Sequence, residues 1–111
     1  PAMHTGIDLA AARGTPVMAA GLGTISFAGW NGGYGRMIEI DHGNGHRTRY
    51  GHLSQIGVIE GDRVEPGQVI GQVGSSGRST GPHLHYEMVR DGHRRDPAPY
   101  LAVAAELAGK I

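Results

Sequence analysis

The sequence contains no cysteine. This absence excludes disulfides, thiolate metal ligands and cysteine-based nucleophilic chemistry. A transition-metal site in this chain would therefore have to be built from His, Asp and Glu side chains. Seven histidines are present in the 111 residues, so the nitrogen ligands for such a site are available.

An excess of one charge is also missing, because ten Lys and Arg balance ten Asp and Glu. No run of either sign occurs, which argues against the basic stripe of a nucleic-acid-binding protein and against electrostatic binding to a membrane. No stretch approaches the ~20 apolar residues of a transmembrane helix. Lysine occurs once, as Lys110, which excludes a biotinyl or lipoyl carrier domain, since such a domain needs an exposed lysine at a hairpin tip.

The length is that of one domain, and we expect residues 1–111 to form it. A chain of this size buries roughly two-thirds of the surface exposed by its unfolded form, so it folds without disulfides or a structural metal. The chain begins with Pro1-Ala2-Met3, which lacks the charged and apolar regions of a signal peptide. We interpret the chain as a domain of a longer precursor, with any export signal upstream of Pro1.

Twenty glycines separate short β-branched and apolar runs, a pattern typical of many short strands joined by tight turns. Strands are predicted over residues 15–20, 23–28, 36–40 and 46–50. Residues 41–45 are predicted to form a hairpin turn in which Asn44-Gly45 suits positive φ. Residues 58–74 resemble a compact β-turn-β unit.

One helix is predicted, at the C-terminal end. Asp96 can cap it, Pro97 suits its first turn, and Gly109-Lys110 can close it. The sequence therefore predicts an all-β fold class, a small antiparallel sheet or sandwich-like domain with one short C-terminal helix.

His83 and His85 lie two residues apart on a predicted strand. On a strand, such residues project from the same face about 6.6 Å apart, whereas Leu84 and Tyr86 point to the other side. One imidazole can bind a metal while the other contacts the water or the substrate, and the spacing does not choose between them. Considered by itself, the pair is equally typical of a polar sheet face.

His4 and Asp8 are four residues apart, which separates their Cα atoms by about 13 Å in an extended strand. A shared ion therefore requires a bend, and Gly6 can supply it. Without further ligands, Asp8 is as typical of a turn or cap. With His85 added, the set becomes His, Asp, His with an open position, which lets zinc lower the pKa of bound water from 15.7 to about 7. The same set holds ferrous iron in oxygenases.

A hydrolase also needs a proton acceptor and a donor to the developing oxyanion. No His-Glu-x-x-His motif is present. His52, and whichever of His83 and His85 is not a ligand, can fill these roles because imidazole changes its charge near neutral pH; otherwise His52 is a buried histidine bonded to a carbonyl.

Glu87 follows His85 on the same face, where it can accept a proton from a ligand imidazole or form a surface ion pair. The remaining imidazoles, of His42, His46 and His93, lie in or beside predicted turns and are expected to be solvated.

Four motifs, in this order, resemble those of the LytM or lysostaphin-type zinc endopeptidases: His4-Thr5-Gly6-Ile7-Asp8, Gly33-Tyr34-Gly35, Tyr50-Gly51-His52-Leu53 and Ser79-Thr80-Gly81-Pro82-His83-Leu84-His85-Tyr86-Glu87. The resemblance runs from about His4 to Leu101, and four ordered motifs are more specific than any one of them. It implies a small antiparallel β fold with an open groove and hydrolysis of peptide bonds in bacterial peptidoglycan.

Carried over residue by residue, the resemblance implies that His4, Asp8 and His85 are the ligands of one zinc ion. His52 and His83 are implied as the catalytic pair that faces the water and the oxyanion. The implied partner is a peptidoglycan peptide, with neither nucleic acid nor membrane contact, and the implied location is the periplasm or cell envelope. Members of this family are often held latent by an upstream segment, and no oligomeric state is predicted.

Two other classes remain as alternatives. Some family members have lost ligands and act as catalytically silent scaffolds that bind peptidoglycan or regulate amidases, but every implied position is filled here. A cupin-like iron oxygenase shares the His-x-His strand, yet its glutamate usually falls several residues after the second His, whereas Glu87 follows His85 by only two.

Overall fold

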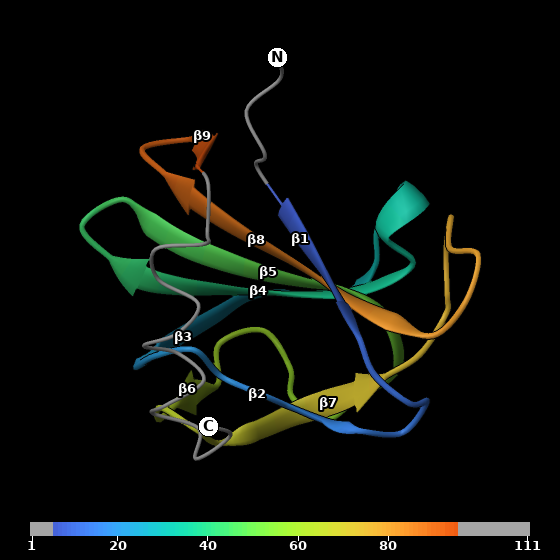
Figure 1. Ribbon diagram of the computed structural model, residues 1–111. Helices are drawn as coiled ribbons and strands as arrows, with labels where there is room; N and C mark the ends of the chain where they lie inside the picture. The colour runs from blue at the N-terminus through green and yellow to red at the C-terminus, as the bar shows by residue number, and fades with distance from the viewer. Residues whose placement is uncertain (1–5, 96–111) are drawn as a thin grey trace.

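The computed structural model describes residues 6–95, and in this range it consists of nine strands and one short 3₁₀ helix (Figure 1). The elements are β1 (Gly6–Ala10), β2 (Pro16–Met18), β3 (Gly23–Trp30), η1 (Gly32–Tyr34), β4 (Arg36–Gly43), β5 (His46–Ile56), β6 (Arg63–Val64), β7 (Val69–Val73), β8 (His83–Arg90) and β9 (His93–Arg95). The predicted all-β antiparallel fold class is confirmed. The predicted C-terminal helix lies outside the described residues.

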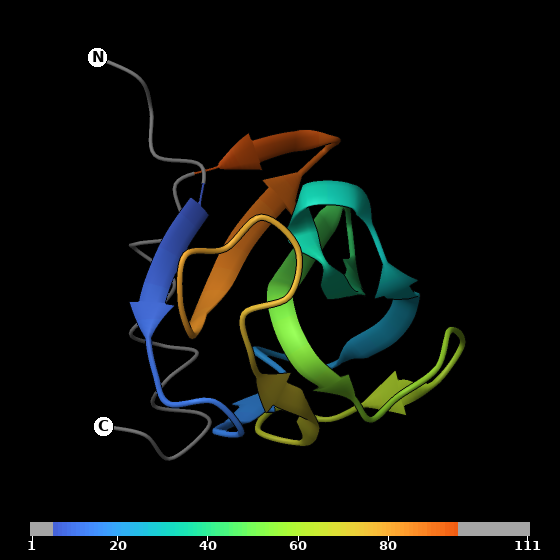
Figure 2. The same ribbon diagram turned by 90° about the vertical axis from the view of Figure 1, so that its right-hand side faces the viewer.

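The strands follow the order β1-β8-β5-β4-β3-β6, and β2, β7 and β9 pair off this path. The 11-residue strand β5 is the centre of the sheet. Its first part pairs with β4 and β8, and its last part pairs with β7. Figures 1 and 2 show that the β2–β7 pair lies across the β8–β5–β4 part of the sheet, which gives the domain a sandwich-like form.

The hydrophobic core fills the space between these two parts. Most of its buried side chains come from β2, β3, β4, β5, β7 and β8: Val17, Ile25, Ile38, Ile40, Tyr50, Leu53, Ile70, Val73 and Tyr86. Val64 from β6 and Ala19 and Val58 from connecting segments add to them. Ile38 and Ile40 share one face of β4 because strand side chains alternate. The opposite face of the sheet carries polar groups, and it is this face that holds the candidate site.

The predicted strands are all present, but their bounds differ from the local pattern: β2 is shorter than predicted, whereas β3, β4 and β5 run further. Strand β4 continues to Gly43 and β5 to Ile56, so the hairpin turn shrinks to Asn44-Gly45, with φ values of 53° and 79°. The predicted unit at 58–74 also differs. Its two strands do not pair with each other, since β6 pairs with β3 and β7 pairs with β2 and β5.

A chain of hydrogen bonds crosses the core between β4 and β5. His42 Nδ1 donates to the Leu22 carbonyl at 2.8 Å, which leaves Nε2 to accept from the Thr48 hydroxyl at 2.7 Å. The Tyr50 hydroxyl donates to Thr48 Oγ1 at 2.7 Å and accepts from the Ala20 N–H at 3.0 Å. Every donor in this chain therefore has an acceptor.

The expectation that His42 is solvated is therefore wrong. Its ring is half-buried on β4 and bonded at both nitrogens, and burial lowers its pKa. Of the other two imidazoles, His93 is exposed as expected, whereas His46 is half-buried. Tyr50, at the far end of the same chain, has a pKa raised to about 12 by burial.

Replacing Thr48 by Val should destabilise the domain by about 1–3 kcal/mol. The change removes the acceptor of the buried Tyr50 O–H and the donor to His42 while preserving the side-chain shape. Urea unfolding at pH 7 measures the loss. The matched control is Thr24→Val, whose hydroxyl accepts only a 3.4 Å bond from Arg63 and whose effect should stay within about 0.5 kcal/mol. Equal stability of the Thr48 variant and the unchanged protein would contradict the proposed hydrogen-bond chain.

Candidate metal centre

Antiparallel pairing of β1 with β8 sets Asp8 directly opposite His85. Asp8 Oδ1 lies 2.7 Å from His85 Nδ1 and 3.5 Å from His83 Nε2. The hydrogen bond from His85 holds the pKa of Asp8 below its usual value, although partial burial opposes this. Two of the three predicted ligands, 77 residues apart in the sequence, therefore present their donor atoms to each other.

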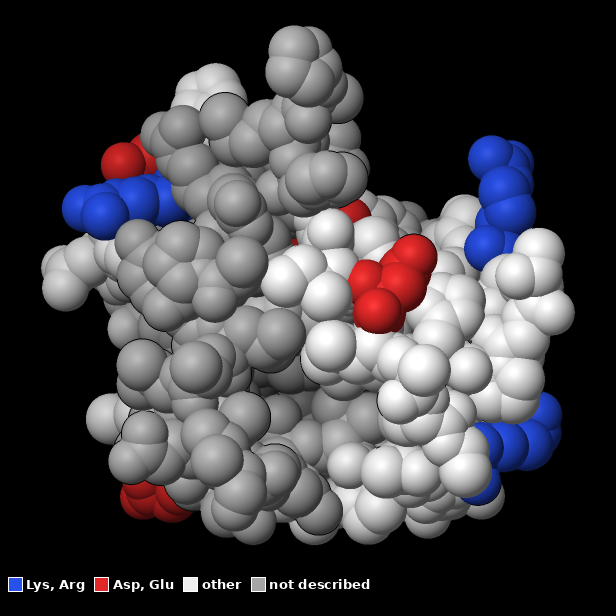
Figure 3. Space-filling model, viewed as in Figure 1, with Lys and Arg blue, Asp and Glu red and all other residues white. Residues whose placement is uncertain are grey.

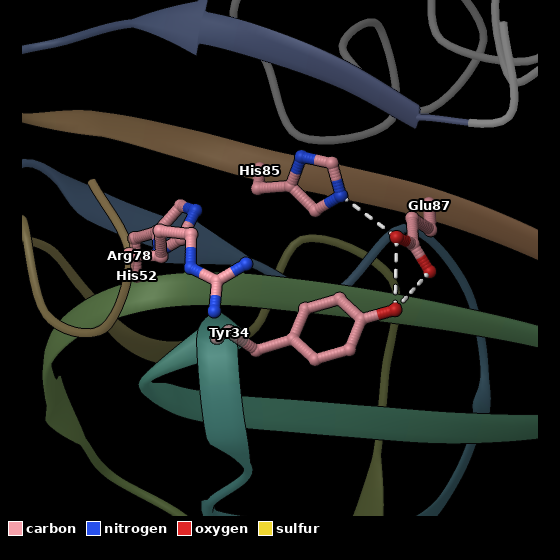
Figure 4. A pocket seen from close by; sticks show the side chains of 6 residues that line it. Tyr34, His52, Arg78, His85 and Glu87 are labelled. Carbon is pink, nitrogen blue, oxygen red and sulfur yellow. Dashed lines mark hydrogen bonds and ion pairs between the residues drawn. The ribbon is translucent and has the colours of Figure 1, made fainter. Parts of the chain in front are cut away.

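His85 is held from its other side by a buried carboxylate. Its Nε2 lies 2.7 Å from Glu87 Oε2, and the Glu87 side chain is only 2% exposed (Figure 4). The Tyr34 hydroxyl bonds to the two Glu87 oxygens at 2.9 and 3.0 Å, and Arg49 approaches at 3.4 Å. Of the two roles expected for Glu87, the structure supports that of acceptor for the imidazole rather than that of a surface ion pair.

These contacts explain the electrostatics of the pair. Burial tends to raise the pKa of Glu87, but the hydrogen bonds from His85 and Tyr34 bring it below the ordinary value. The same hydrogen bond with Glu87 raises the pKa of His85, and the bond with Asp8 adds to this effect. Because both ring nitrogens of His85 face carboxylates, a cation is required between Nδ1 and Asp8, either a proton or a metal ion.

Gly6 has a different role from the expected bend. It lies in β1 opposite Glu87, and a Cβ built on it would fall 2.7 Å from His85 Cε1. The glycine therefore makes room for the His85 ring. His4, the third predicted ligand, lies outside the described residues. Within residues 6–95, no three imidazole or carboxylate groups form a complete metal cage.

His52 and His83 lie beside this pair, with ring centroids 4.8 Å apart. His52 Nδ1 donates to the Ser76 carbonyl at 2.7 Å, and His83 Nδ1 donates to the Gly81 carbonyl at 2.9 Å. In a neutral imidazole this leaves Nε2 as the acceptor. Both rings therefore have Nδ1 fixed by a backbone carbonyl, and the Nε2 of His83 faces Asp8 Oδ1 at 3.5 Å.

His52 is placed by a local irregularity in β5. Its φ is 60°, in the left-handed region that non-glycine residues seldom occupy. It falls between Gly51, which pairs with His85 on β8, and Leu53, which pairs with Val73 on β7. The strand thus changes partner at this residue, which is only 7% exposed. Such strain is typical of functional positions.

The pocket in front of these side chains has a volume of about 300 Å³ and is lined by Gly33, Tyr34, His52, Arg78, His85 and Glu87. The 74–82 loop forms one wall, as the sequence predicted, and it is anchored to η1 by a 2.9 Å bond from the Arg78 N–H to the Gly33 carbonyl. Gly35 and Gly77 both have positive φ, and a Cβ on either would lie under 2.7 Å from the other segment. The close contact of the two loops thus depends on these glycines.

Several contributors to the site were missed from the sequence. Tyr34 belongs to the Gly33-Tyr34-Gly35 motif, but that motif does not predict the hydrogen bond from the Tyr34 hydroxyl to Glu87. Arg49 reaches the site only through the β5–β8 register, where it pairs with Glu87. Arg78 lies in the loop predicted as a wall, and only its inward direction was unexpected.

Comparisons with known proteins agree with this geometry. The model of Peptidase family M23 matches residues 2–97. DD-carboxypeptidase/endopeptidase Mpg of Neisseria meningitidis serogroup B is 51% identical over 105 residues, which cover 95% of this chain and 24% of that protein. The catalytic domain of lysostaphin from Staphylococcus simulans has a TM-score of 0.84 at 43% identity, covering 90% of this chain and 80% of that one. A zinc-containing peptidase from Vibrio cholerae has a TM-score of 0.81 at 38% identity, covering 84% of this chain and 29% of that one.

The chain belongs to peptidase family M23. It spans about a quarter of the length of the Neisseria relative. The family resemblance noted in the sequence is therefore confirmed.

The bonding pattern predicts the tautomers of the two paired imidazoles. At a pH where they are neutral, His52 and His83 should carry their protons on Nδ1, since each Nδ1 donates to a backbone carbonyl. Long-range ¹H–¹⁵N NMR spectra distinguish protonated from unprotonated ring nitrogens. The exposed His93 serves as a reference for an imidazole in solvent. Protonation of either His52 or His83 at Nε2 instead would show that its ring is turned the other way.

Proposed function

We propose that this domain is a zinc-dependent endopeptidase that hydrolyses peptide bonds in bacterial peptidoglycan. The observation that carries the proposal is the approach of Asp8 Oδ1 to His85 Nδ1 at 2.7 Å, with the His52 and His83 rings beside them. The names of relatives in family M23, among them peptidoglycan DD-endopeptidase ShyC of Vibrio cholerae and lysostaphin of Staphylococcus simulans, support the choice of substrate.

His4, Asp8 and His85 would hold the zinc ion. The donor set fits: a carboxylate oxygen and an imidazole nitrogen face each other, and Glu87 holds the second nitrogen of His85, as carboxylates do behind zinc-binding histidines. When bound, zinc supplies a Lewis acid that activates water and polarises the scissile carbonyl.

His52 and His83 would then act in proton transfer and in hydrogen bonding to the oxyanion. An Nε2 lone pair accepts the proton of the attacking water, and a protonated Nε2 donates a hydrogen bond to the oxygen on which negative charge develops. The carbonyls of Ser76 and Gly81 keep both rings oriented for these tasks. Tyr34 and Arg49 act at a distance, since they hold the Glu87 carboxylate that in turn orients His85.

We further propose that the domain works outside the cytoplasm, in the periplasm or cell envelope, because its substrate is there. We also propose that an upstream segment of the longer protein inhibits this domain. The chain's charge supports a peptide partner over nucleic acid or membrane. On the face seen in Figure 3 the charged side chains of the described residues are scattered and form no stripe of one sign. No helix in residues 6–95 is long and apolar enough to span a membrane.

The activity is tested by incubating the protein with purified sacculi and identifying released fragments by mass spectrometry. We expect soluble muropeptides whose new ends identify the bond that is cut. Treatment with a chelator should abolish the release, and addition of zinc should restore it. A protein that binds zinc and sacculi but releases no muropeptides would instead be the silent scaffold. Metal analysis that finds iron rather than zinc in the purified protein would favour the oxygenase-type metal site.

The assigned roles predict two classes of variant. Asp8→Ala and His85→Ala should lose both zinc and activity, because each removes a ligand. His52→Ala and His83→Ala should retain zinc while activity falls by about 10²–10⁴-fold, the usual contribution of a general acid or base. Metal analysis and muropeptide release measure the two properties separately. Full activity of the His83 variant would contradict the catalytic pair, and loss of zinc from it would make His83 a ligand.

A further inference from the structure

Arg78 lies in the candidate pocket and has no role in the chemistry described so far. It follows the Gly77 turn in the loop between β7 and β8, and it lines the same pocket as His52 and His85. In Figure 4 its guanidinium extends from the side of the pocket where His52 lies towards the middle. A positive charge thus lies in the same pocket as the side chains proposed to carry out hydrolysis.

The backbone holds this residue firmly at the rim. The Arg78 N–H donates to the Gly33 carbonyl at 2.9 Å, and the preceding Gly77 packs against Gly35 so closely that no Cβ would fit. The Ser76 hydroxyl next to it donates to the Leu53 carbonyl at 2.6 Å. The origin of the side chain is therefore fixed relative to the sheet, even though the side chain itself is exposed.

No carboxylate within residues 6–95 forms an ion pair with Arg78. The arginines on the neighbouring sheet face differ, since Arg47 and Arg49 both bind Glu39. The two carboxylates nearest the reaction centre are engaged elsewhere, because Asp8 and Glu87 both bond to His85. Among the described residues, the pocket therefore presents a guanidinium without an ion-pair partner to whatever enters it.

We propose that Arg78 binds a carboxylate of the peptide substrate close to the scissile bond and thereby selects anionic peptides over neutral ones. The planar guanidinium can grip a carboxylate through two parallel hydrogen bonds, which gives orientation as well as affinity. Because Arg78 lines the same pocket as His52 and His85, a carboxylate bound to it would lie near the bond to be cut. This inference rests on the proposed peptidase function and specifies its substrate class.

Such a carboxylate has two sources in a peptide, the free C-terminus and an acidic side chain. The test uses the full chain loaded with zinc and a synthetic peptide containing the bond identified in the sacculus experiment. The peptide is made with both carboxylates free, with either one amidated, and with both amidated. Initial rates give kcat and KM separately for each form.

For the unchanged protein, kcat/KM should be roughly tenfold to a hundredfold higher for the peptide in which the carboxylate bound by Arg78 is free than for the peptide in which it is amidated. This is the range expected for hydrogen bonds to a charged group. Whichever single amidation causes this drop identifies the carboxylate that is bound. Arg78→Gln should lower kcat/KM for the carboxylate form by the same factor, mainly by raising KM. Its kcat/KM for the amide form should stay within about threefold of that of the unchanged protein. Arg78→Lys should lose less than Arg78→Gln, since lysine keeps the positive charge but cannot form the two parallel hydrogen bonds of a guanidinium.

The matched control is Arg63→Gln, an exposed arginine on β6 that lines a different cavity, and it should behave like the unchanged protein on every peptide. Equal losses of Arg78→Gln on carboxylate and amide forms would overturn the inference. So would an unchanged protein that cleaves all forms equally well, and in that case the proposed peptidase function would still stand. Cleavage of no form by the unchanged protein would overturn that function, and this inference with it.

Discussion

The pairing of β1 with β8 is the constraint on which the rest of the site depends. It brings the first described strand of the chain next to the last long one and places Asp8 opposite His85. Because strand side chains alternate between faces, a slip of one residue would turn Asp8 away from His85 and towards the core. Neither residue can form a metal site alone, so this register creates the candidate centre.

Behind this pair, a row of cross-strand ion pairs fixes the position of the imidazole. Glu39 on β4 faces Arg49 on β5, and Arg49 faces Glu87 on β8. The distances are 2.8 and 3.4 Å. A buried carboxylate is costly unless it is paired and hydrogen-bonded. Glu87 meets this condition through Arg49, Tyr34 and His85. These contacts offset the cost of burying its negative charge, so the carboxylate can hold the His85 ring.

Local periodicity was enough to predict part of this arrangement. A period of two residues places His83 and His85 on one face of β8, and the glycine-rich pattern indicates short strands with tight turns. Periodicity contains no information about which strands pair. The bond from Tyr34 to Glu87 joins residues 53 positions apart, and the His42 ring is bonded to Leu22 in the β2–β3 connection and to Thr48 on β5. These contacts follow from register, which the sequence pattern did not specify.

The 74–82 loop links proton transfer to substrate choice. The carbonyls that orient His52 and His83 belong to Ser76 and Gly81, and Arg78 lies between these two positions in the same loop. The sheet supplies Asp8, His85 and Glu87, and none of the three bonds to the Arg78 side chain. Substitution at position 78 can therefore change what the pocket binds without moving the imidazoles. Changes that displace the loop backbone would disturb binding and proton transfer together, because both are fixed by the contact between Gly35 and Gly77.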